Sequence, residues 1–142
     1  MRILIADDEE INCDLLASIL MPYGTCVFAS NGAEAAGLFA ESVANNNPFE
    51  LVMLDIKMPI MDGQSALKAI RRIEKHDPAL RHPTVVIIVT SLDSQEEITR
   101  AFLEGQCTDY LTKPIEKELL LKKLRQFHWH QEAPFGRPNL YG

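Results

Sequence analysis

Acidic residues follow two short apolar runs of this 142-residue chain. Residues 7–10, which read Asp-Asp-Glu-Glu, come directly after the run ILIA, and Asp55 comes directly after LVML. Thr90 follows the run TVVIIV, and Lys113 follows DYLT. Carboxylate oxygens suit Mg²⁺, a threonine hydroxyl can donate to a phosphoryl oxygen, and an ammonium group neutralises phosphoryl charge. Brought together, these groups would suit transfer of a phosphoryl group to Asp55, because that chemistry needs positioning and charge neutralisation.

Five apolar runs alternate with longer segments in which apolar residues recur at helical spacing. The runs predict strands, and they cover residues 2–6, 25–29, 51–54, 84–89 and 109–111. A helix follows each strand, so crossovers join the strands into a mostly parallel sheet wrapped by helices. The carboxyl ends of such strands lie at one edge of the sheet, where ligands collect. We therefore expect the acidic residues, Thr90 and Lys113 to converge there.

Two further patterns support these elements. The third and fourth runs lack alternation, which is typical of strands covered on both faces, and this predicts that they are central. Ser94 with Glu97 has the form of a capping box at a helix N-terminus, and Asn31 with Glu34 imitates that form at another.

Each candidate residue also has an ordinary structural role. Residues 7–10 would complement a helix dipole, Asp55 would cap the chain leaving its strand, and Lys113 would neutralise them. Thr90 alone is most simply a β-branched residue that closes a strand. Carboxylates crowded at one edge, however, repel one another unless a cation lies among them. The combination favours a magnesium site, and the set holds no soft ligand for zinc.

The chain resembles the receiver domain of two-component response regulators, in particular a single-domain, chemotaxis-regulator-like type. The segments ILIADDEE, LVMLDIKMPIMDG, VIIVTS and DYLTKPI carry the resemblance and occur in the family's order. It implies an α/β fold, a doubly wound (βα)5, flavodoxin-like three-layer sandwich whose parallel five-stranded sheet has the order 2-1-3-4-5. The receiver domain would span residues 1–127, with its last helix over 115–127. Residues 128–142 have little periodicity and are expected to form a flexible C-terminal tail or linker.

The resemblance implies a role for each acid of the cluster. Asp55 corresponds to the phospho-acceptor. Asp7 and Asp8 correspond to the acid pair that binds Mg²⁺ together with Asp55. Lys57 matches the position whose backbone carbonyl completes the metal shell.

The resemblance also implies a switch. Thr90 and Lys113 correspond to the residues that grip the phosphoryl group, and the peptide bond between Lys113 and Pro114 would be cis. Tyr110 corresponds to the aromatic switch position. Phosphorylation would draw Thr90 towards the phosphate and leave space for Tyr110 to turn, so that the surface of the fourth helix, fifth strand and fifth helix changes.

The function implied by the resemblance is a phosphorylation-dependent signalling switch. A sensor histidine kinase, a phosphotransfer protein or a small phosphodonor would supply the phosphoryl group. The chain would not be an enzyme beyond catalysing its own aspartyl phosphorylation and dephosphorylation. The changed surface would control a protein target or an output domain outside this chain, and a phosphorylation-dependent homodimer is left open.

Composition excludes several classes of function. The chain has 14 Lys and Arg against 20 Asp and Glu, a net charge of −6 that argues against direct contact with nucleic acid. No apolar run reaches the roughly 18 residues of a membrane span. Three widely spaced cysteines form neither a disulfide framework nor a Cys-x-x-Cys site, which favours buried thiols in a reducing, cytoplasmic compartment.

Three other functions remain as alternatives. An aspartate-nucleophile phosphatase of the haloacid dehalogenase kind would need a carboxylate where Lys57 stands. A flavin-binding module on the same fold would need backbone donors after the first strand, where residues 7–9 would repel a phosphate. A degenerate receiver could serve only as a docking surface, although the required residues are all present.

The sequence also departs from the commonest receiver pattern. Residues 74–83, EKHDPALRHP, predict an elongated connection before the fourth strand. Ser91 adds a hydroxyl where the family usually has a small residue. Leu92 and Lys57 lie at positions where side chains can obstruct or aid the water that attacks a phosphoaspartate, so the phosphoryl lifetime stays open.

Overall fold

The computed structural model describes residues 1–77, 80, 82–91 and 93–129. Within them a five-stranded sheet has the order β2-β1-β3-β4-β5, and all its pairs are parallel. The strands are β1 Arg2–Ala6, β2 Thr25–Ala29, β3 Leu51–Asp55, β4 Val85–Thr90 and β5 Asp109–Thr112. The strand order, the parallel pairing and the doubly wound α/β class all agree with the expectation from the sequence.

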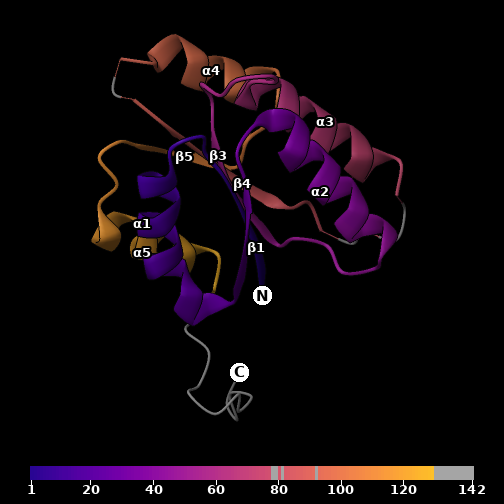
Figure 1. Cartoon of the computed structure of the whole chain (residues 1–142), viewed down its shortest axis with the longest axis horizontal. Helices are drawn as coiled ribbons and strands as arrows, with labels where there is room; N and C mark the ends of the chain where they lie inside the picture. The colour runs from indigo at the N-terminus through magenta and orange to yellow at the C-terminus, as the bar shows by residue number, and fades with distance from the viewer. Residues whose placement is uncertain (78–79, 81, 92, 130–142) are drawn as a thin grey trace.

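Helices cover both faces of this sheet. They are α1 Glu10–Leu20, α2 Gly32–Ala44, α3 Gly63–Lys75, α4 Gln95–Leu103 and α5 Lys117–Gln126, with a short 3-10 helix η1 at Met21–Tyr23. Buried residues of α1 and α5 share one core cluster with one face of the sheet, and buried residues of α2, α3 and α4 share a second cluster with the other face. Figure 1 shows the same grouping, with α1 beside α5 and α2 beside α3. The molecule is therefore a three-layer sandwich.

The two unbroken apolar runs form interior strands, as predicted. Every residue of β3 is buried, and all of β4 except Val85 is buried. Helices lie over both faces, so neither face of these strands needs polar side chains. The strands extend one residue further than expected at their carboxyl ends: Asp55 pairs with Val89, and Thr90 pairs with Thr112. Asp55 and Thr90 are thus held by the sheet itself rather than by a loop.

Only one of the two predicted capping boxes forms a side-chain cap. Asn31 caps α2, with its side-chain oxygen accepting from the Glu34 backbone N–H at 2.8 Å. Ser94 precedes α4 but makes no such bond, and its hydroxyl lies 3.0 Å from the Ser91 hydroxyl instead. Its backbone, at φ −104° and ψ 36°, is not extended as a capping residue normally is. The prediction of a cap at Ser94 was therefore wrong.

The last helix is shorter than predicted and packing continues past it. It spans residues 117–126 because Glu116 has extended backbone. Beyond the helix, the backbone N–H of Trp129 donates to the Leu124 carbonyl. The Trp129 and Phe127 rings have centroids 5.5 Å apart and pack against the core. Packing thus reaches two residues beyond the expected boundary at 127, and residues 130–142 lie outside the described part of the chain.

Among the residues that the structure describes, no helix is both long enough and apolar enough to cross a membrane.

Candidate functional site

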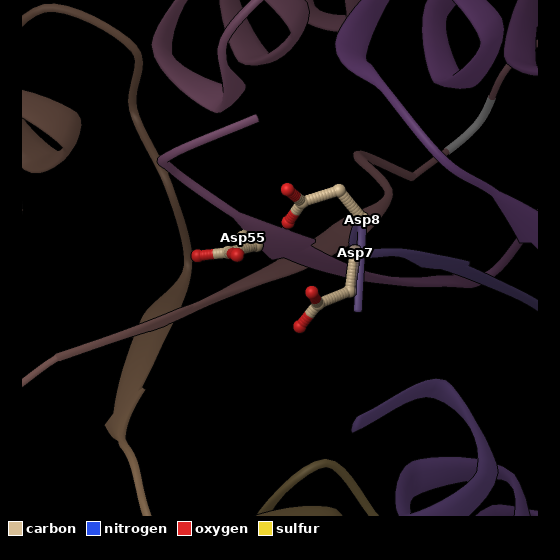
Figure 2. Close-up of side chains that lie close together, drawn as sticks. All are labelled: Asp7, Asp8 and Asp55. Atoms are coloured by element: carbon tan, nitrogen blue, oxygen red, sulfur yellow. The ribbon is translucent and has the colours of Figure 1, made fainter. Parts of the chain in front are cut away.

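Three carboxylates meet at the carboxyl edge of the sheet. Asp7 and Asp8 come directly after β1, and Asp55 is the last residue of the neighbouring strand β3. One oxygen from each of the three side chains lies within 4.8 Å of the others. Figure 2 shows the three side chains close together at the ends of the two strands. Asp7 and Asp55 are buried, whereas Asp8 is exposed. The convergence expected from the strand ends is therefore present.

Lys113 joins this cluster from the chain after β5. Its Nζ lies 3.1 Å from Asp55 Oδ2 and 3.3 Å from Asp7 Oδ2. Its backbone N–H donates to the Thr90 carbonyl at 2.7 Å, which fixes the segment beside the end of β4. The peptide bond between Lys113 and Pro114 is cis, as the resemblance implied. One ammonium group thus faces two buried carboxylates.

Charges in the cluster shift one another's pKa. Burial raises the pKa of Asp55 to about 6, and repulsion from Asp7 adds to this rise, while Lys113 opposes it. Burial alone would lower the pKa of Lys113, but attraction to Asp55 and Asp7 outweighs burial and raises it. Lys113 therefore stays charged, yet a single cation does not compensate the acids that face it.

The oxygen atoms of this cluster fit a hard divalent cation. Asp7 Oδ1 accepts from the Glu9 backbone N–H at 2.9 Å, while Asp7 Oδ2 is buried and accepts no hydrogen bond of ordinary geometry from the described residues. Apart from the ion pair with Lys113, that oxygen is free to coordinate. Three carboxylates with open positions suit Mg²⁺, which keeps several waters and binds phosphate oxygens. The donor set offers no thiolate or imidazole for a softer metal.

The loop after β3 lies close against the acceptor. The Gly63 N–H donates to the Ile56 carbonyl at 2.7 Å, and a Cβ at Gly63 would lie 2.0 Å from the Asp55 carbonyl oxygen. A side chain is therefore excluded there, and glycine allows α3 to start directly beside Asp55. Lys57, in the same loop, is exposed.

Thr90 and Tyr110 occupy different environments. Thr90 is 1% exposed at the end of β4. Tyr110, on β5, is 40% exposed and packs edge-to-face on Phe102 of α4, with ring centroids 6.1 Å apart. Lys123 Nζ of α5 lies 5.8 Å from the Tyr110 ring centroid. Tyr110 thus lies among α4, β5 and α5 in this structure, outside the acidic cluster.

One buried polar residue near the site escaped the sequence analysis. Gln64, next to Gly63, is 1% exposed and bonds to Glu97 of α4. Its spacing of three residues from Leu67 and six from Ile70 places it on the buried face of α3, and that spacing was the available signal. Leu92, singled out for phosphoryl lifetime, lies outside the described residues.

A family model identifies the fold and the motifs together: the model of the response regulator receiver domain matches residues 3–125. The chain belongs to this family. Curated relatives of the receiver domain include the sensor histidine kinase GacS of Pseudomonas protegens, 34% identical over 119 residues that make up 84% of this chain and 12% of that protein. The response regulator PleD of Caulobacter vibrioides is 34% identical over 125 residues, 87% of this chain and 25% of that protein. The chain therefore spans a quarter or less of these relatives.

Solved structures agree with this assignment. The receiver domain of Ssk1 from Saccharomyces cerevisiae, crystallised with the histidine phosphotransfer protein Ypd1, superposes with a TM-score of 0.75 at 30% identity, covering 89% of this receiver and 87% of that chain. A receiver from Clostridium thermocellum gives a TM-score of 0.72 at 28% identity, covering 88% and 91%. A CheY of Borrelia burgdorferi in a complex with CheX, BeF₃ and Mg²⁺ gives 0.74 at 23% identity, covering 92% and 90%, which shows the fold alone.

Proposed function

We propose that this receiver is a phosphorylation-dependent switch in which Asp55 accepts a phosphoryl group. The observation that carries the proposal is the ion pair of Lys113 with Asp55 inside a cluster of three carboxylates. An Asp55 oxygen forms the new P–O bond while the bond from phosphorus to the donor breaks, and the donor's histidine nitrogen or, for an acyl phosphate, its carboxylate oxygen leaves with the electron pair of that bond. Lys113 and a bound Mg²⁺ would balance the negative charge gained at Asp55.

Mg²⁺ is the cofactor we propose for this reaction. Asp7, Asp8 and Asp55 would hold the ion, and the backbone carbonyl of Lys57 would complete its shell. The bound ion supplies charge neutralisation at the phosphoryl oxygens. Asp7 remains ion-paired to Lys113 and keeps that ammonium beside the acceptor.

Thr90 and Lys113 are proposed to bind the phosphoryl oxygens. Lys113 already faces Asp55, and Thr90 closes the adjacent strand. Movement of Thr90 towards the phosphoryl group would let Tyr110 leave its contact with Phe102. The surface formed by α4, β5 and α5 would then change, and we assign the output signal to that surface.

Partners follow from the same proposal. A sensor histidine kinase or a phosphotransfer protein would donate the phosphoryl group, in line with the Ssk1 receiver, which was crystallised with such a protein. The output would act on a protein target, an output domain beyond residues 128–142, or a second copy of the receiver domain of residues 1–127. The three cysteines are free thiols, which supports a cytoplasmic location, and catalysis would be limited to the receiver's own phosphorylation and dephosphorylation.

Intact mass after incubation with acetyl phosphate tests this function. We expect one phosphoryl group on the wild type in the presence of Mg²⁺, and none without it. Asp55→Ala should take up none. Asp62→Asn is the matched control, because Asp62 lies in the same loop but caps α3, and asparagine can cap equally well. A folded wild type that takes up no phosphoryl group under any condition would contradict this function and would favour a degenerate receiver that serves only as a docking surface.

A further inference from the structure

Gln64 is a buried amide that links α3 to α4. Its Nε2 donates to the Glu97 main-chain carbonyl at 2.6 Å and lies 3.3 Å from Glu97 Oε2. Its Oε1 is buried and has no hydrogen-bond partner among the described residues. Leaving a buried acceptor unpaired costs free energy, and such groups in native structures call for a specific explanation. The amide is therefore only half satisfied in the arrangement seen here.

The helix that Gln64 contacts has little apolar anchorage. Of the nine residues of α4, all of which the structure describes, Ala101 alone is buried. A second polar link to α3, from Lys68 Nζ to Glu104 Oε2 at 3.4 Å, joins side chains that are 41% and 51% exposed. Exposed ion pairs of this kind contribute little to stability. The hydrogen bond from the buried Gln64 amide is part-buried and is thus the stronger of these two polar restraints on α4.

The other end of this link touches the acceptor's backbone. Gly63 precedes Gln64, and its Cα lies so close to the Asp55 carbonyl that no Cβ would fit. A closely packed interior has little free space, so a displacement of one group moves the group in contact with it. A change in the backbone at Asp55 therefore reaches the start of α3, and Gln64 with it, by direct contact.

We propose that Gln64 is a latch that holds α4 in its resting position. Its hydrogen bond to the Glu97 carbonyl opposes the rearrangement of the surface formed by α4, β5 and α5. This inference rests on the proposed function, and it adds to the movement of Thr90 and Tyr110 a second restraint on that surface. Breaking the latch shifts the equilibrium towards the active arrangement, so a ligand that prefers the active arrangement binds more tightly.

Gln64→Met tests the latch, because methionine is similar in size but removes both the donor and the unpaired oxygen. Without ligand, amide hydrogen exchange in residues 95–103 should accelerate about fivefold or more, with exchange in β1 and β3 unchanged. The affinity for beryllofluoride with Mg²⁺, a phosphoryl mimic, should rise about threefold or more, while the affinity for Mg²⁺ alone stays the same. If Gln64 only stabilised the fold, its replacement would not raise the affinity for beryllofluoride with Mg²⁺ while leaving the affinity for Mg²⁺ alone unchanged. Gln64→Leu should behave in the same way.

Two controls isolate the bond. Glu97→Ala keeps the main-chain acceptor and removes the side chain alone, and Lys68→Met removes the exposed ion pair; both should leave α4 exchange within about twofold of the wild type. Unchanged α4 exchange in the folded Gln64 variants, or no gain in beryllofluoride affinity, would overturn the latch. A wild type that fails to bind beryllofluoride with Mg²⁺ would instead count against the proposed function, and the exchange comparison without ligand would still decide the latch.

Discussion

Asp55 destabilises the metal-free fold at neutral pH, because its pKa is raised above the ordinary value. The folded state binds a proton more tightly than the unfolded state, so this destabilisation is complete above a pH of about 6 and disappears as pH falls to the ordinary value near 3.8. Asp55→Asn should therefore raise the free energy of unfolding by roughly 1–3 kcal/mol at pH 8 without metal. Urea unfolding at pH 8 and pH 4 measures this. A variant no more stable than the wild type at pH 8 would contradict the assigned electrostatics.

Protons and Mg²⁺ should compete for the same carboxylate. A metal ligand must be deprotonated, so Mg²⁺ affinity should fall as pH drops through the Asp55 pKa of about 6. Below that pH we expect up to about a tenfold loss per pH unit, and proton release on binding, both measurable by calorimetry. Lys68→Met is the control: Lys68 lies on α3 and pairs with Glu104, so this variant should titrate as the wild type does. A Mg²⁺ affinity that does not change between pH 7 and pH 5 would show that Asp55 is not a ligand of the metal.

Most of the site could be predicted at the residue scale. Asp7, Asp8 and Lys113 follow strands and Asp55 ends one, and parallel strands bring such residues to one edge. Gln64 could not be assigned a role, because its partner Glu97 is 33 residues away and the pairing depends on how α4 packs. The outward position of Tyr110 likewise depends on packing against Phe102.

At the scale of elements, the loop between β3 and α3 stores backbone strain beside the site. Ile60 has φ 71°, a left-handed conformation that β-branched residues rarely adopt, and its side chain is 86% exposed. Ile60→Asn should raise the free energy of unfolding by about 1 kcal/mol, because asparagine tolerates this conformation and little burial is lost. Urea unfolding measures the change. Ile11→Asn is the matched control, because Ile11 is 81% exposed but lies within α1, and this variant should not be more stable than the wild type. If both variants were more stable, the loss of an exposed apolar side chain would be the cause and not the relief of strain.

Element types were predictable where the apolar pattern was strong. The unbroken runs before Asp55 and Thr90 specify strands that helices cover on both faces, and the structure has them. The cap at Ser94 was not predictable from residue type, because neighbouring Ser91 competes for its hydroxyl. Strand ends shifted by one residue, because the last pairings depend on the partner strand, and α5 begins two residues later than expected because Glu116 has extended backbone.

At the scale of the whole molecule, two core layers share one sheet. Phe39 is fully buried in the layer of α2 and α3, whereas Trp129, the one tryptophan of the chain, packs against the opposite layer. Phe39→Ala should lower the free energy of unfolding by about 3–5 kcal/mol, and both layers should unfold together. Trp129 fluorescence and far-UV circular dichroism should therefore shift to lower urea by the same amount. A fluorescence transition that stays in place would mean that the layers unfold separately.

The central claim is that phosphorylation of Asp55 changes the distant surface of α4, β5 and α5. Amide chemical shifts of the wild type with Mg²⁺, before and after acetyl phosphate, test it most directly, with Asp55→Ala as the reference. We predict changes at Phe102 of α4, Tyr110 of β5 and the exposed Leu119 of α5, as well as around the aspartates, and none of them in the variant. If the protein is fully phosphorylated and the shift changes stay confined to the surroundings of Asp55, the proposed switch is contradicted.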